Sequence, residues 1–255
     1  MSTGRNKYEA SASATGYLYQ CRYALYAGVR AIPDNPNLEI SIERFDDVAF
    51  EQAGEPVKLI QVKHHVARKG NLTDASTDLW KTLRIWAERL TADLEASVKT
   101  SFVLMTTGVA PAGSAASYLR ARDRDEANAL DLLVKVTDMS TSETNKAAYT
   151  AFLDLLPEAR LNLLRALTVL DGSSNVIDVR DDLTHELRYA VSKDYLSLFM
   201  ERLEGWWFNV VVRALMGIGV ASIPLTAIEN KMDDRKQDGR SSRRVQARRA
   251  ADRLR

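Results

Sequence analysis

The sequence predicts an α/β core followed by an all-α region. Up to about residue 110, segments with the apolar period of a helix alternate with short runs that have the period of a strand, and from about residue 112 almost every pattern is helical. The chain has 255 residues, 45% of them hydrophobic and 27% charged, which is ordinary for a globular protein. This length can bury one substantial core or two small ones.

Within the core the predicted order is helix, strand, strand, helix, strand. The elements are a helix over 12–31, strands over 38–50 and 57–65, a helix that follows the capping residues 73–76 and ends near 97, and a strand over 101–107. Residues 38–43 alternate apolar and polar side chains, and residues 52–56 have turn composition, so the first two strands are expected to form a hairpin.

The second half of the chain reads as a series of helices separated by Gly, Ser, Asp or Pro. The predicted helices are 115–122, 127–135, 146–155, 157–170, 181–189 and 192–216, and only 176–179 has the composition of a short strand. The polar stretch 140–145 resembles a linker. We therefore expect a first domain over 1–145, a helical domain over 146–230 and a basic tail over 231–255.

The net charge of +1 conceals an uneven distribution. Residues 231–255 hold 10 basic and 4 acidic side chains, whereas residues 1–230 hold 25 basic and 30 acidic ones. Such a tail can hold phosphates without reading base sequence, or it can be a solvated chain end, and the sequence leaves both interpretations open.

The composition also bears on cellular location. The longest apolar run, 210–220, contains Arg213 and is too short to span a bilayer, and the first residues lack a signal pattern. We expect a cytoplasmic protein with no membrane partner. Cys21 is the single cysteine, so an intrachain disulfide and a cysteine-rich zinc site are excluded, and its helical context predicts a small core residue.

The most informative polar residues lie on the two predicted strands of the hairpin. Side chains two apart on a strand share a face, which would align Glu43 with Asp47 and Gln61 with Lys63. Two carboxylates, an amide oxygen and an ammonium are costly to bury together unless a divalent cation neutralises them, and oxygen ligands suit Mg²⁺. Strand parity places Asp46 on the opposite face, although a β-bulge would exchange it with Asp47.

These residue types fit the hydrolysis of a phosphodiester, which needs a cation and a positioned water. Asp47 and the Gln61 amide oxygen are the expected ligands, with the main-chain carbonyl of Val62 as a third oxygen. Lys63 would orient the water or stabilise negative charge. Glu43 would complete the coordination, directly or through a water.

The pattern of an Asp, then an acidic or amide residue, one spacer and a Lys resembles the PD-(D/E)XK motif, with Gln in place of the acid and without the motif's proline. Further matching segments are residues 15–20, 60–64, 78–82 and 106–108, besides residues 202–207, which resemble the helical part that follows the nuclease in such proteins. Together they resemble the double-stranded DNA endonuclease domain of bacterial antiphage effectors, including those controlled by cyclic oligonucleotides and those of ABC-three-component systems. The likeness covers roughly residues 8–125.

This resemblance implies a restriction-endonuclease-like core, in which helices flank a mixed β-sheet. It also implies a Mg²⁺-dependent endonuclease, with Mn²⁺ as an alternative metal, that cuts double-stranded DNA with low sequence specificity in phage defence. Gln20 is carried over as a helix residue that faces the metal, and Lys63 as the catalytic base or charge stabiliser. Other subunits of a defence system, or self-association, are the implied protein partners.

Three residues after the second strand are candidates for DNA contacts: His64, Arg68 and Lys69. Two other functions stay open. The first is a nucleic-acid-binding or scaffold subunit of a defence complex with weak or no catalysis. The second is an RNA-directed nuclease of the same fold, because both backbones present the same phosphate.

Overall fold

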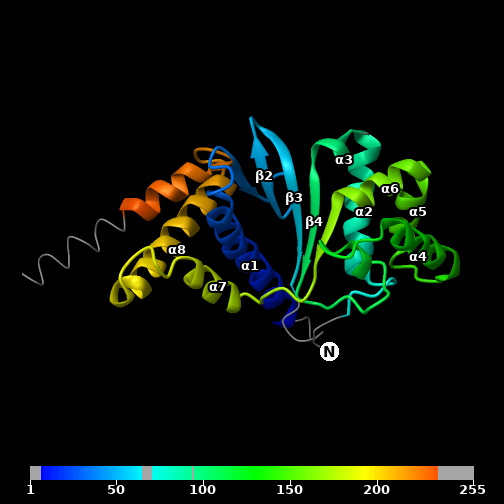
Figure 1. The fold of residues 1–255 in the computed structure, drawn as a ribbon, viewed down its shortest axis with the longest axis horizontal. Helices are drawn as coiled ribbons and strands as arrows, with labels where there is room; N and C mark the ends of the chain where they lie inside the picture. Colours follow the sequence, from blue (N-terminus) through cyan, green and yellow to red (C-terminus); the bar gives the residue numbers. More distant parts are fainter. Residues whose placement is uncertain (1–6, 65–70, 94, 235–255) are drawn as a thin grey trace, which may run out of the picture. The chain divides into compact units, whose positions relative to one another are not determined.

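The computed structural model describes residues 7–64, 71–93 and 95–234, which fall into two compact units. Unit 1 comprises Met1–Gln20 and Glu43–Asn175, and unit 2 comprises Cys21–Ile42 and Val176–Arg255. Helix α1 (Lys7–Ala31) contributes residues to both units. The described residues have a mixed α/β fold with a mainly helical C-terminal region, as the sequence predicts (Figure 1).

Unit 1 contains a mixed four-stranded sheet with the order β5-β4-β3-β2. The strands are β2 (Val48–Gln52), β3 (Glu55–Lys63), β4 (Ser101–Thr106) and β5 (Leu167–Leu170). Strands β2 and β3 are antiparallel, which confirms the predicted hairpin, whereas β3, β4 and β5 run parallel to one another. The long connections between the parallel strands contain the helices of this unit, as such connections require.

A two-residue turn sets the register of the hairpin. Ala53 and Gly54 both have positive φ angles, 52° and 84°, as in a type I′ turn, whose twist matches that of the flanking strands. Gln52 pairs with Glu55, and Val48 at the start of β2 pairs with Ile60 near the end of β3. The residues that precede β2 are therefore held beside the last residues of β3.

The helices of unit 1 gather beside β4 (Figure 1). They are α2 (Thr77–Ala92), α3 (Ala96–Lys99), the 3₁₀ helix η1 (Ser117–Leu119), α4 (Glu126–Met139), α5 (Lys146–Asp154) and α6 (Pro157–Ala166). The Asp125 side chain caps α4 by accepting a hydrogen bond of 2.9 Å from the Asn128 amide. Arg124 donates to the main-chain oxygens of Leu164 and Leu167, which satisfies carbonyls at the C-terminal end of α6.

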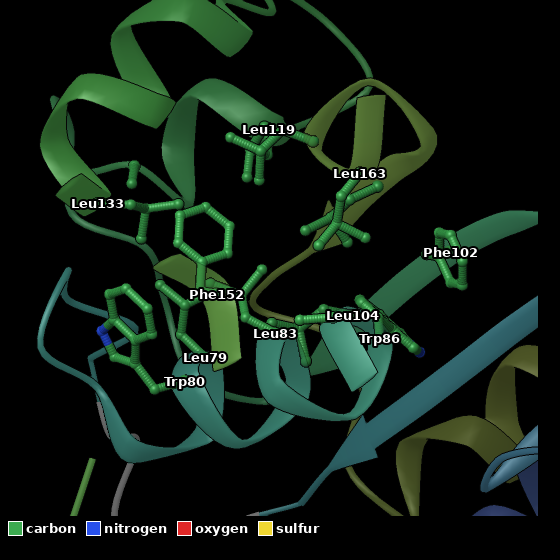
Figure 2. Packing of buried hydrophobic residues seen from close by; sticks show 14 of the residues in the cluster. Leu79, Trp80, Leu83, Trp86, Phe102, Leu104, Leu119, Leu133, Phe152 and Leu163 are labelled. Atoms are coloured by element: carbon green, nitrogen blue, oxygen red, sulfur yellow. The ribbon is translucent and has the colours of Figure 1, made fainter. Parts of the chain in front are cut away.

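The core of unit 1 lies between these helices and the sheet (Figure 2). Trp80 on α2 makes edge-to-face contacts with Tyr149 and Phe152, with ring centroids 4.5 and 5.7 Å apart. Trp86, two turns further along α2, packs on Phe102 of β4 at 5.0 Å. Both tryptophans are core residues, because neither side chain is exposed.

Unit 2 contains the second half of α1 and the elements that follow residue 176. These are β1 (Glu39–Ile42), α7 (Asp178–Glu186), α8 (Lys193–Leu215), β6 (Ile223–Pro224) and a helical segment over 225–234. Strand β1 pairs with β6 in antiparallel fashion. A Cβ atom at Gly28 would lie 2.9 Å from Ile228, so this glycine allows close packing. Trp207 donates to the carbonyl of Cys21 at 2.7 Å, and both residues are buried, as predicted for Cys21.

The structure differs from the predicted elements in four main places, the first being the helix expected over 115–122, where only the three-residue 3₁₀ helix η1 (Ser117–Leu119) forms. The single strand expected over 38–50 is interrupted at Glu43, whose φ of 57° cannot continue an extended chain. The expected helix over 157–170 ends at Ala166, and the next four residues form β5. Residues 176–179, expected as a short strand, instead lead into α7, which begins at Asp178.

The division into units also differs from the boundary expected near residue 145. Helices α5 and α6 lie in unit 1 because they pack into its core and lead into β5, which pairs with β4. The strand β1, expected in the first domain, lies in unit 2 instead. Of the tail expected over 231–255, residues 231–234 are helical and 235–255 lie outside the described residues. No helix in the described part of the chain is long and apolar enough to cross a bilayer.

The packing of Trp80 gives a first prediction. Replacing Trp80 with Ala removes a fully buried ring and leaves a cavity, so we expect the free energy of unfolding in urea to fall by about 3–5 kcal/mol. Ile85→Ala on the same helix is the matched control. Because Ile85 is 42% exposed, this variant should lose much less free energy of unfolding. Equal losses in the two variants would contradict this account of the core.

Candidate functional site

The polar residues predicted as a site meet where the bend before β2 lies beside the end of β3, within unit 1. Residues 43–47 form a bend and not a strand, and the Glu43 amide donates to the Asp47 carbonyl at 3.3 Å. The strand parity expected for Glu43, Asp46 and Asp47 therefore does not apply. The bend brings both Asp46 and Asp47 to β3, because each makes a contact with residue 61 or 62.

Asp46 is saturated with hydrogen bonds. Its Oδ1 accepts from the Gln61 side-chain amide and, at 2.9 Å, from the main-chain amide of Asp47, while its Oδ2 accepts from the indole N–H of Trp86 at 2.9 Å. The carboxylate thus connects the bend to β3 and α2. We infer a positioning role for Asp46, since both of its oxygens already have partners.

Asp47 has a different environment. Its Oδ2 accepts from the main-chain amide of Val62 at 2.6 Å, and no described residue is recorded as donating to its Oδ1. Burial is the largest cause that raises the pKa of Asp47, to about 6, while the Val62 amide and Lys63 act in the opposite direction. Asp46 and Glu43 raise this pKa further by charge repulsion. The structure therefore favours Asp47 over Asp46 as a ligand, because only Asp47 has an open oxygen.

Gln61 and Lys63 share one face of β3, as the sequence predicts. The Lys63 ammonium donates to the Gln61 amide oxygen at 2.5 Å, and the Gln61 amide nitrogen donates to Asp46. Only this orientation of the Gln61 amide suits both neighbours, because the reverse would point N–H groups at the ammonium. Gln61 is buried and Lys63 is half-buried, so the pair lies at the edge of the protein interior.

Tyr19, which precedes Gln20 on α1, contacts His64 at the end of β3. The Tyr19 ring packs on that of His64 with centroids 4.7 Å apart, which brings this turn of α1 beside the residue that follows Lys63. The Gln20 amide oxygen is buried without a hydrogen-bond partner in the described part of the chain. An acceptor left in that state costs about 1–3 kcal/mol, so the position favours a donor or a cation. Both ring nitrogens of His64 are buried, which gives this residue a packing role.

The remaining predicted site residues are placed as follows. Glu43 is exposed, and its recorded influence on the site is the repulsion that raises the pKa of Asp47. Arg68 and Lys69, expected as DNA contacts, lie outside the described residues. Sequence reasoning missed Trp86 as the partner of Asp46, and no local pattern connects these two positions, which are 40 residues apart.

The side chains at this site fit a divalent cation only in part. Among residues 7–64, 71–93 and 95–234, no group of three or more His, Cys, Asp or Glu side chains is placed to hold a metal. A cation here would need amide or main-chain oxygens beside a carboxylate, which is a ligand set that Mg²⁺ accepts. The open oxygen of Asp47, its raised pKa and the unpaired oxygen of Gln20 fit such a ligand.

The solved structures that are similar to this chain include two bacterial receptors. The Cap4 SAVED/CARF-domain containing receptor of Acinetobacter baumannii, solved with the cyclic trinucleotide 2'3'3'-cAAA, matches 89% of this chain and 46% of its own, with a TM-score of 0.52 and 15% identity. The Cap4 SAVED/CARF-domain containing receptor of Moraxella osloensis matches 87% of this chain and 49% of its own, with a TM-score of 0.51 and 18% identity. The chain therefore spans about half the length of these receptors, and the likeness shows a shared fold.

No family model matches the chain, and no curated protein matches it. These findings contradict the resemblance to PD-(D/E)XK endonucleases that the motifs suggested, because the structures that share this fold are named as SAVED/CARF-domain containing receptors. The physical reason is that a short pattern of Asp, Gln and Lys on a hairpin records local chemistry and does not specify a family. The detailed restriction-endonuclease-like core stays a prediction.

The raised pKa of Asp47 predicts a pH-dependent effect on stability. In the unfolded chain an Asp titrates near 3.9, so the raised pKa of Asp47 lowers the stability of the folded state progressively as the pH rises from about 4 to 6, and the full penalty applies above pH 6. Asp47→Asn keeps an acceptor for the Val62 amide and removes the charge. We expect the variant to be more stable than the wild type at pH 8, by up to about 3 kcal/mol.

Urea unfolding at pH 8, 6 and 4.5 checks this expectation, since the advantage of Asp47→Asn should shrink as the pH falls from 6 towards 4. Asp34→Asn, at an exposed position in unit 2, is the control and should show no such trend. A stability difference for Asp47→Asn that stays constant over this range would rule out the raised pKa.

Proposed function

We propose that this chain is the effector component of a cyclic-oligonucleotide-responsive antiphage system and that its site is a Mg²⁺-dependent endonuclease centre for double-stranded DNA. The observation that carries the proposal is the junction of Asp47, Gln61 and Lys63, where a carboxylate with an open oxygen lies next to an amide and an ammonium. The likeness to receptors, one of them solved with a cyclic trinucleotide, supports the signalling context. Mn²⁺ would serve in place of Mg²⁺.

Asp47 and Gln61 would hold the cation, with Gln20 as a further oxygen ligand from α1. Asp47 must be ionised to bind a cation, and its pKa of about 6 means that it is largely ionised at neutral pH. The bound cation supplies the positive charge that offsets the transition state of phosphodiester hydrolysis. The hydrogen bonds of Asp46 would keep the bend and β3 in place as the cation binds and leaves.

Lys63 would stabilise the charge that develops on the phosphate oxygens. Its contact with Gln61 uses one of its three N–H groups and leaves the others for a phosphate or for the attacking water. This arrangement acts on the backbone and does not read bases, which fits low sequence specificity. It also fits RNA, so the substrate assay needs both polymers.

A second candidate function is the binding of a cyclic oligonucleotide by this chain itself. The observation that favours it is the shared fold with a receptor solved with the cyclic trinucleotide 2'3'3'-cAAA. In this case the chain would be a sensor or scaffold subunit, and loss of Lys63 would leave DNA retention unchanged. Isothermal titration with that trinucleotide separates the two functions.

The endonuclease proposal predicts metal-dependent cutting of plasmid DNA. With Mg²⁺ we expect nicked and linear products, and EDTA should abolish them. Lys63→Ala and Asp47→Asn should each lower the cleavage rate by about 100-fold or more, because the first removes a charge that stabilises the transition state and the second removes the charge that holds the cation. The readout is the rate of loss of supercoiled plasmid, repeated with duplex RNA.

Lys58→Ala is the matched control for this assay, because Lys58 is an exposed lysine on the same strand and packs over the Phe50 ring. It should cut at the wild-type rate. Cutting that persists in both Lys63→Ala and Asp47→Asn would show that another site or a contaminant is responsible. If a cyclic trinucleotide is required for activity, its addition should activate the wild type and Lys58→Ala equally.

Metal binding is also predicted to raise thermal stability. For a dissociation constant of about 1 mM, 10 mM Mg²⁺ would stabilise the fold by about 1.4 kcal/mol, which corresponds to a rise of a few degrees in melting temperature. Asp47→Asn should lose this rise, and Lys58→Ala should keep it. A rise of the same size in Asp47→Asn would place the cation elsewhere.

A further inference from the structure

Arg89 lies one turn after Trp86 on α2, close to the residues of the candidate site. Its guanidinium carbon lies 6.0 Å from the centre of the Phe45 ring, and Phe45 directly precedes Asp46. Trp86 on the same helix donates to Asp46. One face of α2 thus contributes an anchor for the Asp46 carboxylate and, three residues later, a positive charge beside the ring of the preceding residue, Phe45.

Arg89 and Arg44 differ in whether their guanidinium groups form an ion pair. Arg44 also lies over the Phe45 ring, at 4.8 Å, but it forms an ion pair of 2.8 Å with Glu51, whose side chain is fully buried. In the described part of the chain, no hydrogen bond or ion pair is recorded for the Arg89 side chain. Its five N–H donors are therefore open to an external acceptor.

We propose that Arg89 is a phosphate-binding residue that holds a phosphodiester group next to the Asp47, Gln61 and Lys63 site, an inference that rests on the proposed function. A planar guanidinium binds two oxygens of a phosphate at once, and a guanidinium held over an aromatic ring loses little freedom on binding. The anion is a phosphodiester either of duplex DNA or of a cyclic trinucleotide. Phe45 orients Arg89 and does not itself touch the ligand.

Binding of a labelled 20-base-pair DNA duplex, followed by fluorescence anisotropy, tests this proposal. Ca²⁺ replaces Mg²⁺ so that the duplex stays intact, and the salt concentration is varied. Losing one phosphate contact lowers the slope of log affinity against log salt by about 0.9. We expect this change in Arg89→Ala, together with roughly 3- to 10-fold weaker binding at low salt, and we expect Arg89→Lys to recover most of the slope.

Arg84→Ala is the matched control, because Arg84 lies on the same helix, is exposed and pairs with Glu88 at 2.6 Å. It removes the same charge from α2 and should leave the slope unchanged. Thermal melting verifies that each variant is folded. The same titrations with 2'3'3'-cAAA identify the source of the phosphodiester, since only the true ligand should lose affinity in Arg89→Ala.

The outcomes separate this inference from the endonuclease proposal. An Arg89-dependent slope without Mg²⁺-dependent cutting would support the phosphate contact and overturn catalysis. Cutting by the wild type with identical binding of both ligands by Arg89→Ala would overturn the contact and leave catalysis standing. A wild type that binds neither the duplex nor the trinucleotide would overturn both.

Discussion

The hydrogen bonds of one carboxylate, that of Asp46, connect the core of unit 1 to the candidate site. One donor is the indole of Trp86, whose ring is fixed by packing on Phe102, and the others come from Gln61 and the amide of Asp47. The bend before β2 therefore has its position set by the hydrophobic core. Two adjacent aspartates acquire different roles in this way, because both oxygens of Asp46 accept hydrogen bonds, whereas one oxygen of Asp47 has no donor among the described residues.

Much of the fold follows from local sequence patterns. The hairpin, the long helix α2 and strand β4 each have an apolar period or turn composition that predicts them, and the structure confirms these elements. Strand β5 was missed because its four apolar and β-branched residues continue the apolar pattern of α6, and only pairing with β4 makes them extended. The break at Glu43 was missed because a glutamate rarely has a positive φ, so its residue type does not predict one.

Only the part of the site that depends on spacing along one strand could be predicted from the sequence. The spacing of Gln61 and Lys63 fixes them to one face of β3, and this relation holds in the structure. The relation of Asp46 to Asp47 depends on a bend, so alternation along a strand could not order them. The environment of Asp47 depends on burial by segments that are distant in the sequence, which no local pattern records. The family suggested by the motif was wrong because residues of this kind recur on unrelated folds.

The three points at which the chain passes from one unit to the other have a practical consequence. Neither unit is a continuous stretch of sequence, since the crossings follow Gln20, Ile42 and Asn175. A truncation at any one of these three crossings would remove part of a unit and leave exposed apolar surface. Isolating either unit for biophysical work would need a spliced or circularly permuted gene, and a nonsense mutation upstream of Asn175 should yield an aggregation-prone fragment.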